Sequence, residues 1–310
     1  MAVKNGIGAE QLRILSDKSI VTFCGKDKDH IAVILGLDQL LRAPVKTPHG
    51  ALFEFDERVA QERAFFELPV VSVACLPDGR IVVLSEDGEV RISDGGELSE
   101  ESFDPKLGPM RAIKQIGTTV YASGVSVQFF RREENGLWTD ISPPRPEDEH
   151  LRRCIVESID GFSEHEIYGS GESGIIWRFD GATWTAVPTP TNLSYYSIHC
   201  GEDGVVYAVG QLGLLARGRG DSFEIVSQDR DFADLWGVAH YRGKLYATSM
   251  RSILVLENDA FVPVLEPMNI AMTFYGLDVA EGVMWSVGEK DILKLDGADW
   301  SRFVDPEWVS

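Results

Sequence analysis

Basic residues are in short supply in this chain. Its 310 residues include 29 lysines and arginines against 49 aspartates and glutamates, which gives a formal net charge of −20. A protein that binds bare nucleic acid needs a basic surface to displace counterions from the phosphates. The charge balance therefore argues against nucleic-acid binding. It leaves two interpretations, a solvated surface that maintains solubility or electrostatic steering of a cationic protein partner.

Long hydrophobic runs are also missing. No window approaches the roughly 18 consecutive apolar residues that a membrane-spanning helix requires. Residues 1–11 contain one lysine and no apolar run of the kind found in a secretory signal. We therefore expect a cytoplasmic protein with no membrane contact.

Cysteine and histidine are sparse, with four and six copies respectively. Neither set has the spacing of a zinc motif, and no HExxH or His-x-His pair occurs. The sequence therefore predicts no metal site and no cofactor. The cysteines are Cys24, Cys75, Cys154 and Cys200.

The chain does contain a repeated sequence motif. It consists of an apolar strand ending in small residues, a turn, a second apolar strand, and an Asx-Gly turn before an aromatic residue. The clearest copies span Glu166–Trp184, Val205–Phe223 and Val283–Trp300. Six copies align, and the spacings between their anchor residues are 39, 47, 39, 39 and 39. The anchors are Val82, Tyr121, Tyr168, Tyr207, Tyr246 and Trp285.

A period of about 40 residues with four short strand patterns is typical of a β-propeller blade. Alternating runs such as Val205–Val209 are rich in β-branched and aromatic residues and are bounded by glycine, which indicates strands. One copy, for example, divides into strands over 236–240, 245–249, 253–257 and 261–265. Such a small sheet must stack on its neighbours to bury both faces.

Upstream of the six copies, a degenerate seventh has expected strands over 20–24, 30–35, 51–56 and 64–68, with an extra stretch at Gly36–Gly50. We therefore predict an all-β fold: one β-propeller domain over residues 1–310, with seven blades of four antiparallel strands. Blade 1 covers about 17–68 and six further blades cover about 69–305. The last copy contains all four strands, so an N-terminal closing strand is not required, and Gln11–Leu15 is the candidate for one.

The segment "VYAVGQLGLLARG" (Val206–Gly218) resembles the repeats of bacterial propellers of the BNR and Ycf48-like group. The turns Asp180-Gly181 and Asp296-Gly297, each before a tryptophan, look like the Asp-box turns of that group, and Asn135-Gly136 is a looser copy. The resemblance covers the chain from about residue 70 onward and implies a propeller with structural turns on its outer rim. Sialidase catalysis would need three converging arginines, and the sequence has no such motif. The WD40 signature is absent as well.

In a propeller, the innermost strand of each blade begins at one mouth of the central channel. Aligning the repeat places Val71, Arg111, Arg153, Tyr196, Trp236 and Tyr275 there, with Arg152 just before. Such a rim suits an anchor side chain, a carboxylate or a peptide. The structural alternative is that half of these side chains point into blade packing, because neighbouring strand residues face opposite sides. The predicted binding residues are Arg111, Arg152, Arg153, Tyr196, Trp236, Tyr275 and, from the loops between second and third strands, Glu172 and Arg251.

Two insertions are predicted at the same mouth, Leu37–Gly50 and the proline-rich, acidic Ser142–His150. Long loops on a rigid scaffold are where binding function concentrates. The four cysteines fall on the inner strands of four different blades, so we expect them to be unpaired small hydrophobic residues in a reducing compartment.

Three functions remain open. The first is a non-catalytic protein-binding propeller, such as an immunity or antitoxin-like protein or an adaptor, that masks a basic partner through one mouth of the ring. The second is a lectin-like propeller that binds a glycan or small molecule. The third is a hydrolase or lyase with Glu172 or Asp234 near Arg153 as acid and base. The acidity and the lack of catalytic motifs favour the first.

Overall fold

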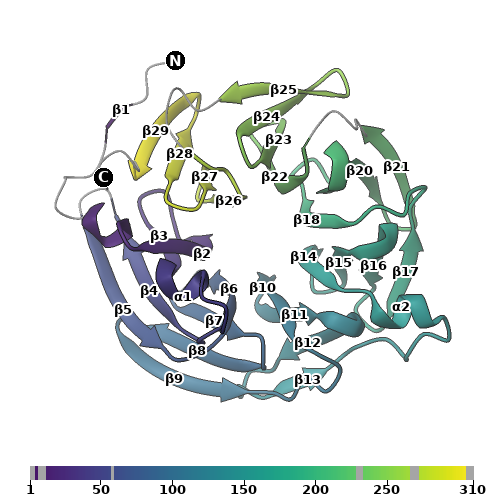
Figure 1. Cartoon of the computed structure of the whole chain (residues 1–310). Helices are drawn as coiled ribbons and strands as arrows, with labels where there is room; N and C mark the ends of the chain where they lie inside the picture. Colours follow the sequence, from purple (N-terminus) through teal and green to yellow (C-terminus); the bar gives the residue numbers. More distant parts are fainter. Residues whose placement is uncertain (1–3, 6–11, 57–58, 228–232, 266–271, 305–310) are drawn as a thin grey trace.

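The computed structural model is a ring of seven antiparallel sheets around a central channel, and each sheet follows the previous one along the chain (Figure 1). The structure describes residues 4–5, 12–56, 59–227, 233–265 and 272–304. None of the helices in these ranges is long and apolar enough to cross a membrane. The prediction of a seven-bladed, four-stranded β-propeller is confirmed.

The strands of each blade run from the channel outward in chain order. Blades 1 to 4 consist of β2 (Lys18–Gly25), β3 (Ile31–Leu37), β4 (Gly50–Phe55) and β5 (Ala60–Phe66); β6 (Val70–Cys75), β7 (Ile81–Ser85), β8 (Glu89–Asp94) and β9 (Glu97–Ser102); β10 (Met110–Ile116), β11 (Thr119–Gly124), β12 (Gln128–Arg132) and β13 (Trp138–Asp140); β14 (Val156–Ser163), β15 (Glu166–Gly171), β16 (Ile175–Phe179) and β17 (Trp184–Pro188).

Blades 5 to 7 consist of β18 (Tyr195–Cys200), β19 (Val206–Gly210), β20 (Leu215–Arg219) and β21 (Ser222–Ser227); β22 (Leu235–Tyr241), β23 (Lys244–Ser249), β24 (Ser252–Glu257) and β25 (Ala260–Leu265); β26 (Gly276–Ala280), β27 (Val283–Val287), β28 (Ile292–Asp296) and β29 (Asp299–Val304). The short helical elements are α1 (Asp38–Leu41), α2 (Glu149–Arg153) and the 3-10 turns η1 (Leu12–Leu15), η2 (Val125–Val127), η3 (Glu172–Gly174) and η4 (Gln211–Gly213).

The predicted strands of blade 6 agree with the structure to within one residue at each end. In blade 1 the fourth strand was misplaced: β5 begins at Ala60 rather than Ala64 and ends at Phe66. This outer strand carries the polar run Gln61–Arg63, so its sequence lacks the apolar alternation that locates the other strands.

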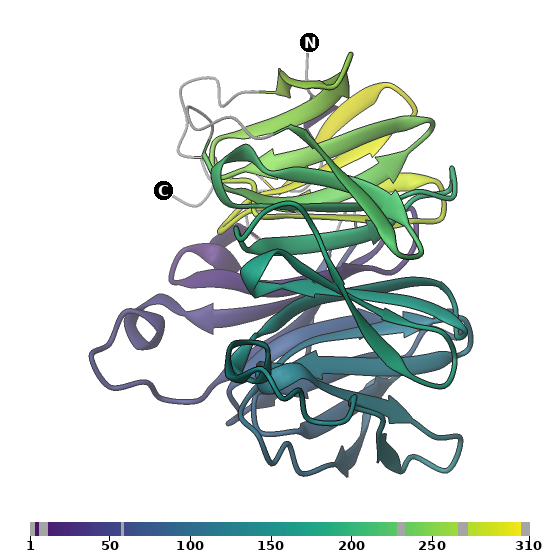
Figure 2. The same cartoon turned by 90° about the vertical axis from the view of Figure 1, so that its right-hand side faces the viewer.

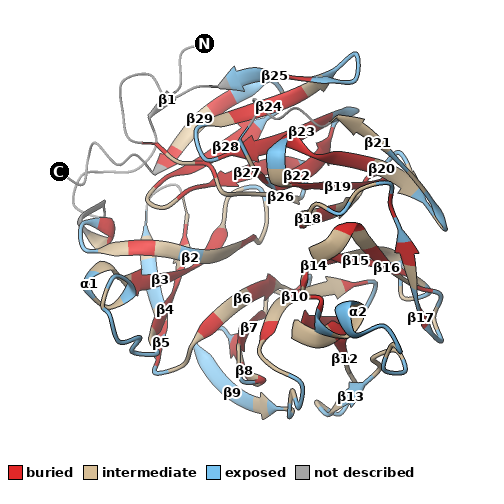
Figure 3. Ribbon diagram, turned by 45° about the vertical axis from the view of Figure 1, so that its right-hand side comes forward, coloured by how far each residue is buried: buried red, intermediate tan, exposed pale blue. Residues whose placement is uncertain are grey.

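The hydrophobic core is divided into seven clusters, and each cluster joins two neighbouring blades. Burial is most complete in the second strand of each blade, as in β7, β19 and β27, where every residue is buried (Figure 3). The six repeat anchors are all buried within these clusters, from Val82 to Trp285. A blade therefore depends on its neighbours for its core, as the repeat length predicts.

The ring closes between blade 7 and blade 1 without exchanging a strand, because β26–β29 supply a complete last blade. The Trp285 indole N–H donates to the carbonyl of Asp27 at 3.1 Å, and the Ile20 N–H donates to the carbonyl of Glu289 at 2.8 Å. The two-residue strand β1 (Lys4–Asn5) pairs in parallel with β29 on the outside of blade 7.

The closing strand predicted at Gln11–Leu15 is wrong. Leu12–Leu15 form the 3-10 turn η1, and residue 11 lies outside the described residues. Leu15 is fully buried in the cluster between blades 1 and 7. Its apolar character therefore reflects packing against the closing interface rather than strand pairing.

The Asx-Gly turn of blade 4 has its expected local structure. The Asp180 carboxylate accepts hydrogen bonds from the N–H groups of Ala182 and Thr183 at 2.9 and 2.8 Å, and Gly181 has a φ of +95°. Trp184, which follows this turn, opens β17, is buried, and stacks on Phe129 of blade 3 with ring centroids 3.6 Å apart.

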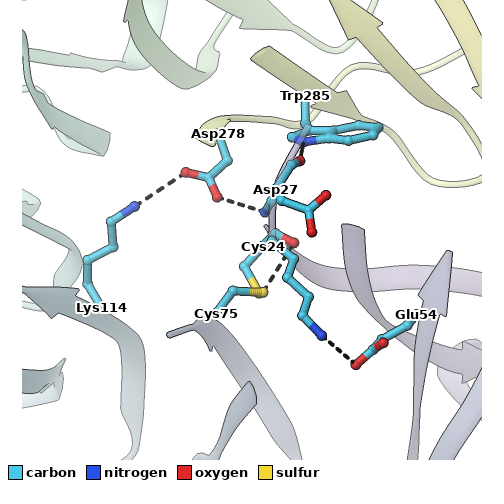
Figure 4. Close-up of a disulfide and its surroundings, with 9 residues drawn as sticks. Cys24, Asp27, Glu54, Cys75, Lys114, Asp278 and Trp285 are labelled. Atoms are coloured by element: carbon cyan, nitrogen blue, oxygen red, sulfur yellow. Dashed lines mark hydrogen bonds and ion pairs between the residues drawn. A yellow bond between two sulfur atoms is a disulfide. The ribbon is translucent and has the colours of Figure 1, made fainter. Parts of the chain in front are cut away.

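The expectation of four unpaired cysteines is wrong. Cys24 of β2 and Cys75 of β6 form a disulfide with a Cα–Cα distance of 5.8 Å (Figure 4). These strands belong to adjacent blades, and inner strands approach each other most closely where the ring narrows to its channel. Cys154 and Cys200 are free thiols.

Candidate functional site

A cavity of about 600 Å³ occupies the centre of the ring and is lined by the innermost strands of all seven blades. Every blade therefore contributes side chains to one continuous channel. The first residues of these strands form the mouth that receives the loops between blades and the loops between second and third strands.

A β-bulge near the mouth determines which side chains reach the channel. Five inner strands shift register directly after their first paired residue, as between Tyr195 and Ser197, and β2 shifts between Ile20 and Thr22. A bulge adds a residue to one strand and re-aims its side chain. Tyr275 holds the corresponding place in blade 7, where its N–H donates to the carbonyl of Val287. These residues, here called the mouth ring, all line the channel: Val21, Val71, Arg111, Glu157, Tyr196, Trp236 and Tyr275.

The structural alternative considered for the rim, in which half of the side chains point into blade packing, applies to Val71, which packs against the core cluster between blades 2 and 3. In the strands with a bulge, the extra residue interrupts the alternation of side chains between the two faces of the strand. Arg111, Tyr196, Trp236 and Tyr275 are thus brought together as predicted.

Arg153 was aligned with this ring, and the structure corrects that alignment. Glu157 holds the position in blade 4, as a count of 39 residues back from Tyr196 would have indicated. Arg152 and Arg153 lie on α2, before the inner strand begins. Arg153 is exposed and forms an ion pair with Glu149, and Arg152 donates to the carbonyl of Glu147 at 2.6 Å.

An aromatic pair dominates the mouth at blades 5 and 6. The rings of Tyr196 and Trp236 stack with centroids 4.5 Å apart and an interplanar angle of 7°. Trp236 remains 37% exposed. The Tyr196 hydroxyl donates to Asp234 Oδ2 at 3.4 Å, and the N–H of Leu212 donates to Asp234 Oδ1 at 3.0 Å. An exposed aromatic surface therefore lies beside a positioned carboxylate.

Carboxylates continue the mouth at blade 4. Glu157 Oε2 lies 3.9 Å from Arg111 Nε, at the limit of an ion pair. Burial raises the pKa of Glu157, Arg111 acts to lower it, and the charge of Glu172 acts to raise it. Glu172 opens η3, and its Oε2 accepts the N–H of Ile155 at 3.2 Å.

The remaining predicted residue, Arg251, is exposed in the turn between β23 and β24, where its N–H donates to Ser249 Oγ at 3.4 Å. Both insertions contain short helices, α1 in the first and α2 at the end of the second. Because strand direction alternates, their loops lie on the face of the channel mouth. The first projects well beyond the ring in the side view (Figure 2).

Deeper in the channel, three residues beyond the mouth ring, lies a charged layer that the sequence reasoning did not identify. Lys114 Nζ lies 3.4 Å from Asp278 Oδ1, and His199 Nδ1 lies 3.3 Å from Asp160 Oδ2. The two aspartates also accept backbone N–H groups of adjacent blades, Gly25 for Asp278 and Cys200 for Asp160. The same count of three from each mouth residue would have located this layer.

The charges of this layer stabilise one another. The charge of Asp278 raises the pKa of Lys114, so the ammonium stays protonated. Burial acts to raise the pKa of Asp160, but the hydrogen bond with His199 and the charge of Lys114 outweigh it, and the net pKa is lowered. Across the described ranges, no three His, Cys, Asp or Glu side chains gather as metal ligands.

No family model matches this chain. It is 35% identical over 244 residues to the immune protein Tsi7 of Pseudomonas aeruginosa, covering 76% of this chain and 80% of that protein. Among solved structures, a catalytically inactive virginiamycin B lyase from Staphylococcus aureus with quinupristin superposes with a TM-score of 0.72 at 14% identity, over 90% of this chain and 94% of the lyase. YCF48 bound to D1 peptide superposes with a TM-score of 0.67 at 13% identity, over 90% and 92%. The solved structures show the shared propeller fold.

Proposed function

Because the chain belongs to the family of the immune protein Tsi7, we propose that it is itself an immunity protein that binds and masks a protein partner. The identity of 35% over 244 residues carries this proposal, and it fits the immunity-like function predicted from the acidity of the chain. The relative's name and the peptide-bound YCF48 propeller both support a protein as the ligand.

The partner docks at the channel mouth. The mouth ring presents the exposed Trp236 stacked on Tyr196, together with the carboxylate of Glu157, and the long insertions are on the same face. Exposed Trp and Tyr side chains at the centre of a concave surface are typical interface anchors. The formal charge of −20 favours a partner with a basic surface, since charge complementarity speeds association.

The test begins with purification of the tagged full-length chain from its native host and native mass spectrometry of what co-purifies. We expect one protein at a fixed stoichiometry. The recovered partner is then titrated against Trp236→Ala and against Leu137→Ala, an exposed apolar residue in the turn between β12 and β13 on the opposite face. Selective loss of affinity in the first variant supports the proposal. Equal affinity in both variants, or no stoichiometric partner, contradicts it.

A second candidate is a lectin-like function, which the aromatic pair also favours, since stacked Tyr and Trp rings present a flat surface to a sugar. The cavity of about 600 Å³ is large enough for a small ligand. A thermal-shift screen with monosaccharides and disaccharides tests it. Stabilisation by a sugar that disappears in Trp236→Ala would support this function, and no stabilisation by any sugar would exclude it.

A further inference from the structure

We propose that the mouth at blades 4 to 6 is a binding site for an arginine side chain, with the guanidinium lying against Trp236 beside Asp234 and with Glu157 adding negative charge at the same mouth. The proposal deepens the proposed function, because it assumes that the masked partner supplies the arginine. The site's preference for a guanidinium group is nevertheless a property of this chain alone and is tested without the partner.

The aromatic pair supplies a platform for a flat cation. Tyr196 stacks on Trp236 at 4.5 Å and 7°, which fixes the indole plane, while Trp236 remains 37% exposed. Tryptophan is the side chain whose face attracts cations most strongly. A guanidinium group is planar and weakly hydrated, so it stacks on such a face more readily than a lysine ammonium does.

The carboxylates beside the platform have acceptor capacity for that cation. Asp234 is held by two neutral donors, the Tyr196 hydroxyl and the Leu212 N–H, and forms no ion pair with the described residues. Among the described residues, the cation recorded within 4 Å of the Glu157 carboxylate is Arg111, at 3.9 Å. An arginine stacked on Trp236 would have Asp234, two residues earlier in the chain, as its acceptor, and guanidinium–carboxylate pairs are the strong class of hydrogen bond.

The charge balance of the whole channel points the same way. Glu157, Glu172 and Asp234 at the mouth face Arg111 and, farther round the rim, Arg251. In the deeper layer Asp160 and Asp278 face Lys114 and the imidazole of His199. Carboxylates thus outnumber permanent cations in both layers. With Glu157 rather than Arg153 in the mouth ring, this part of the rim favours a cation over the carboxylate that an arginine would suit.

The test uses the full-length chain labelled with 5-fluorotryptophan and followed by ¹⁹F NMR, because it reports on each of the seven tryptophans separately. The Trp236 resonance is assigned by its loss in Trp236→Phe. The probes are N-acetyl-arginine amide, the matching lysine amide and the uncharged citrulline amide. We expect arginine amide to shift the Trp236 resonance in a saturable manner, and to bind about tenfold more tightly than either analogue.

Asp234→Asn and Glu157→Gln should each weaken arginine amide binding several-fold without changing the other six resonances. Using two variants protects the test against a local disturbance of the loop at Asp234. An unmoved Trp236 resonance, or equal binding of arginine, lysine and citrulline, would overturn the proposal. So would a native partner whose affinity is unchanged in both variants.

The two proposals fail separately. Selective arginine binding without any stoichiometric partner supports the guanidinium site and contradicts masking. Partner binding that depends on Trp236 but not on Asp234 or Glu157 supports masking and overturns the guanidinium site.

Discussion

The two sides of the channel mouth differ in how their side chains are used. At blades 7, 1 and 2, the mouth ring contributes Tyr275, Val21 and Val71, and the inner strands of blades 1 and 2 are joined by the Cys24–Cys75 disulfide. Lys290 Nζ donates to the carbonyl of Leu15 at 3.0 Å and to Asp38 at 2.7 Å, which links blade 7 to the N-terminal segment. The disulfide and the Lys290 contacts hold this side of the ring together, although Val21 itself is 42% exposed.

At blades 4 to 6 the mouth ring instead carries a carboxylate and two aromatic rings, of which Glu157 and Tyr196 are half-buried. Trp236 is exposed, and Asp234 is bound to neutral donors in the described structure. The closing side must hold the two ends of the chain together, whereas blades 4 to 6 are continuous in sequence and need no such link. The comparison therefore separates a side that maintains the ring from a side with free binding capacity, and the substitutions below probe each side.

The largest effect is expected from Trp285→Ala on the closing side. Trp285 is fully buried, makes an edge contact with Phe303 at 4.9 Å, and donates to the carbonyl of Asp27. Truncating a buried tryptophan leaves a cavity, and we expect the free energy of unfolding to fall by about 3–5 kcal/mol. Urea denaturation measures this. A loss no larger than that of Trp236→Ala would contradict the distinction between the two sides.

The double variant Cys24→Ser/Cys75→Ser is expected to have a free energy of unfolding about 2–4 kcal/mol lower than that of the natural chain. The reason is that the disulfide closes a loop with a sequence separation of 51. Dithiothreitol should lower the stability of the natural chain by a similar amount and leave the double variant unchanged. Equal sensitivity to reductant in both proteins would show that the bond does not form in solution. Thiol labelling in cells then tests the predicted reducing compartment, in which such bonds are rare.

Asp160→Asn is expected to destabilise the ring by about 1–3 kcal/mol at neutral pH, because it removes a buried, charged hydrogen-bond acceptor. Since the folded pKa of Asp160 is lowered from 3.8, its stabilisation is present above that pH and is lost as the pH falls through the folded pKa. The difference in the free energy of unfolding between Asp160→Asn and the natural chain should therefore become smaller in acid. Urea denaturation from neutral pH into acid tests this, with the exposed Glu97→Gln as control. A difference independent of pH would contradict the assignment.

The smallest effect on stability is expected from Trp236→Ala, the counterpart of Trp285→Ala on the other side. It removes one exposed stacked pair, so the free energy of unfolding should change by about 1 kcal/mol or less. Partner affinity should nevertheless fall by at least about tenfold, as for an interface anchor. Calorimetric titration measures the affinity. A large loss of stability with unchanged affinity would assign Trp236 to packing instead.

Much of the fold was predictable because the blade is encoded locally. The anchors from Val82 to Trp285 recur at the repeat spacing, and each must be buried by a neighbouring blade. The candidate site was predictable only in part. The repeat aligns Tyr196 and Trp236 correctly. It misaligns Arg153, because the spacing between the anchors Tyr121 and Tyr168 is 47 residues rather than 39, and the start of the inner strand of blade 4 cannot be counted forward from blade 3. The true rim residue there, Glu157, follows from counting back along the regular copies.

By itself the sequence determined the number of blades, their strands and the face that carries the insertions, since these depend on periodicity along the chain. Only the tertiary structure decided the Cys24–Cys75 pair, the bulges that turn the mouth ring into the channel, and the charged layer around Lys114. Each of these depends on how closely separate inner strands approach when the ring closes. The separation of the inner strands depends on all seven blades together, so the sequence of one repeat does not determine it.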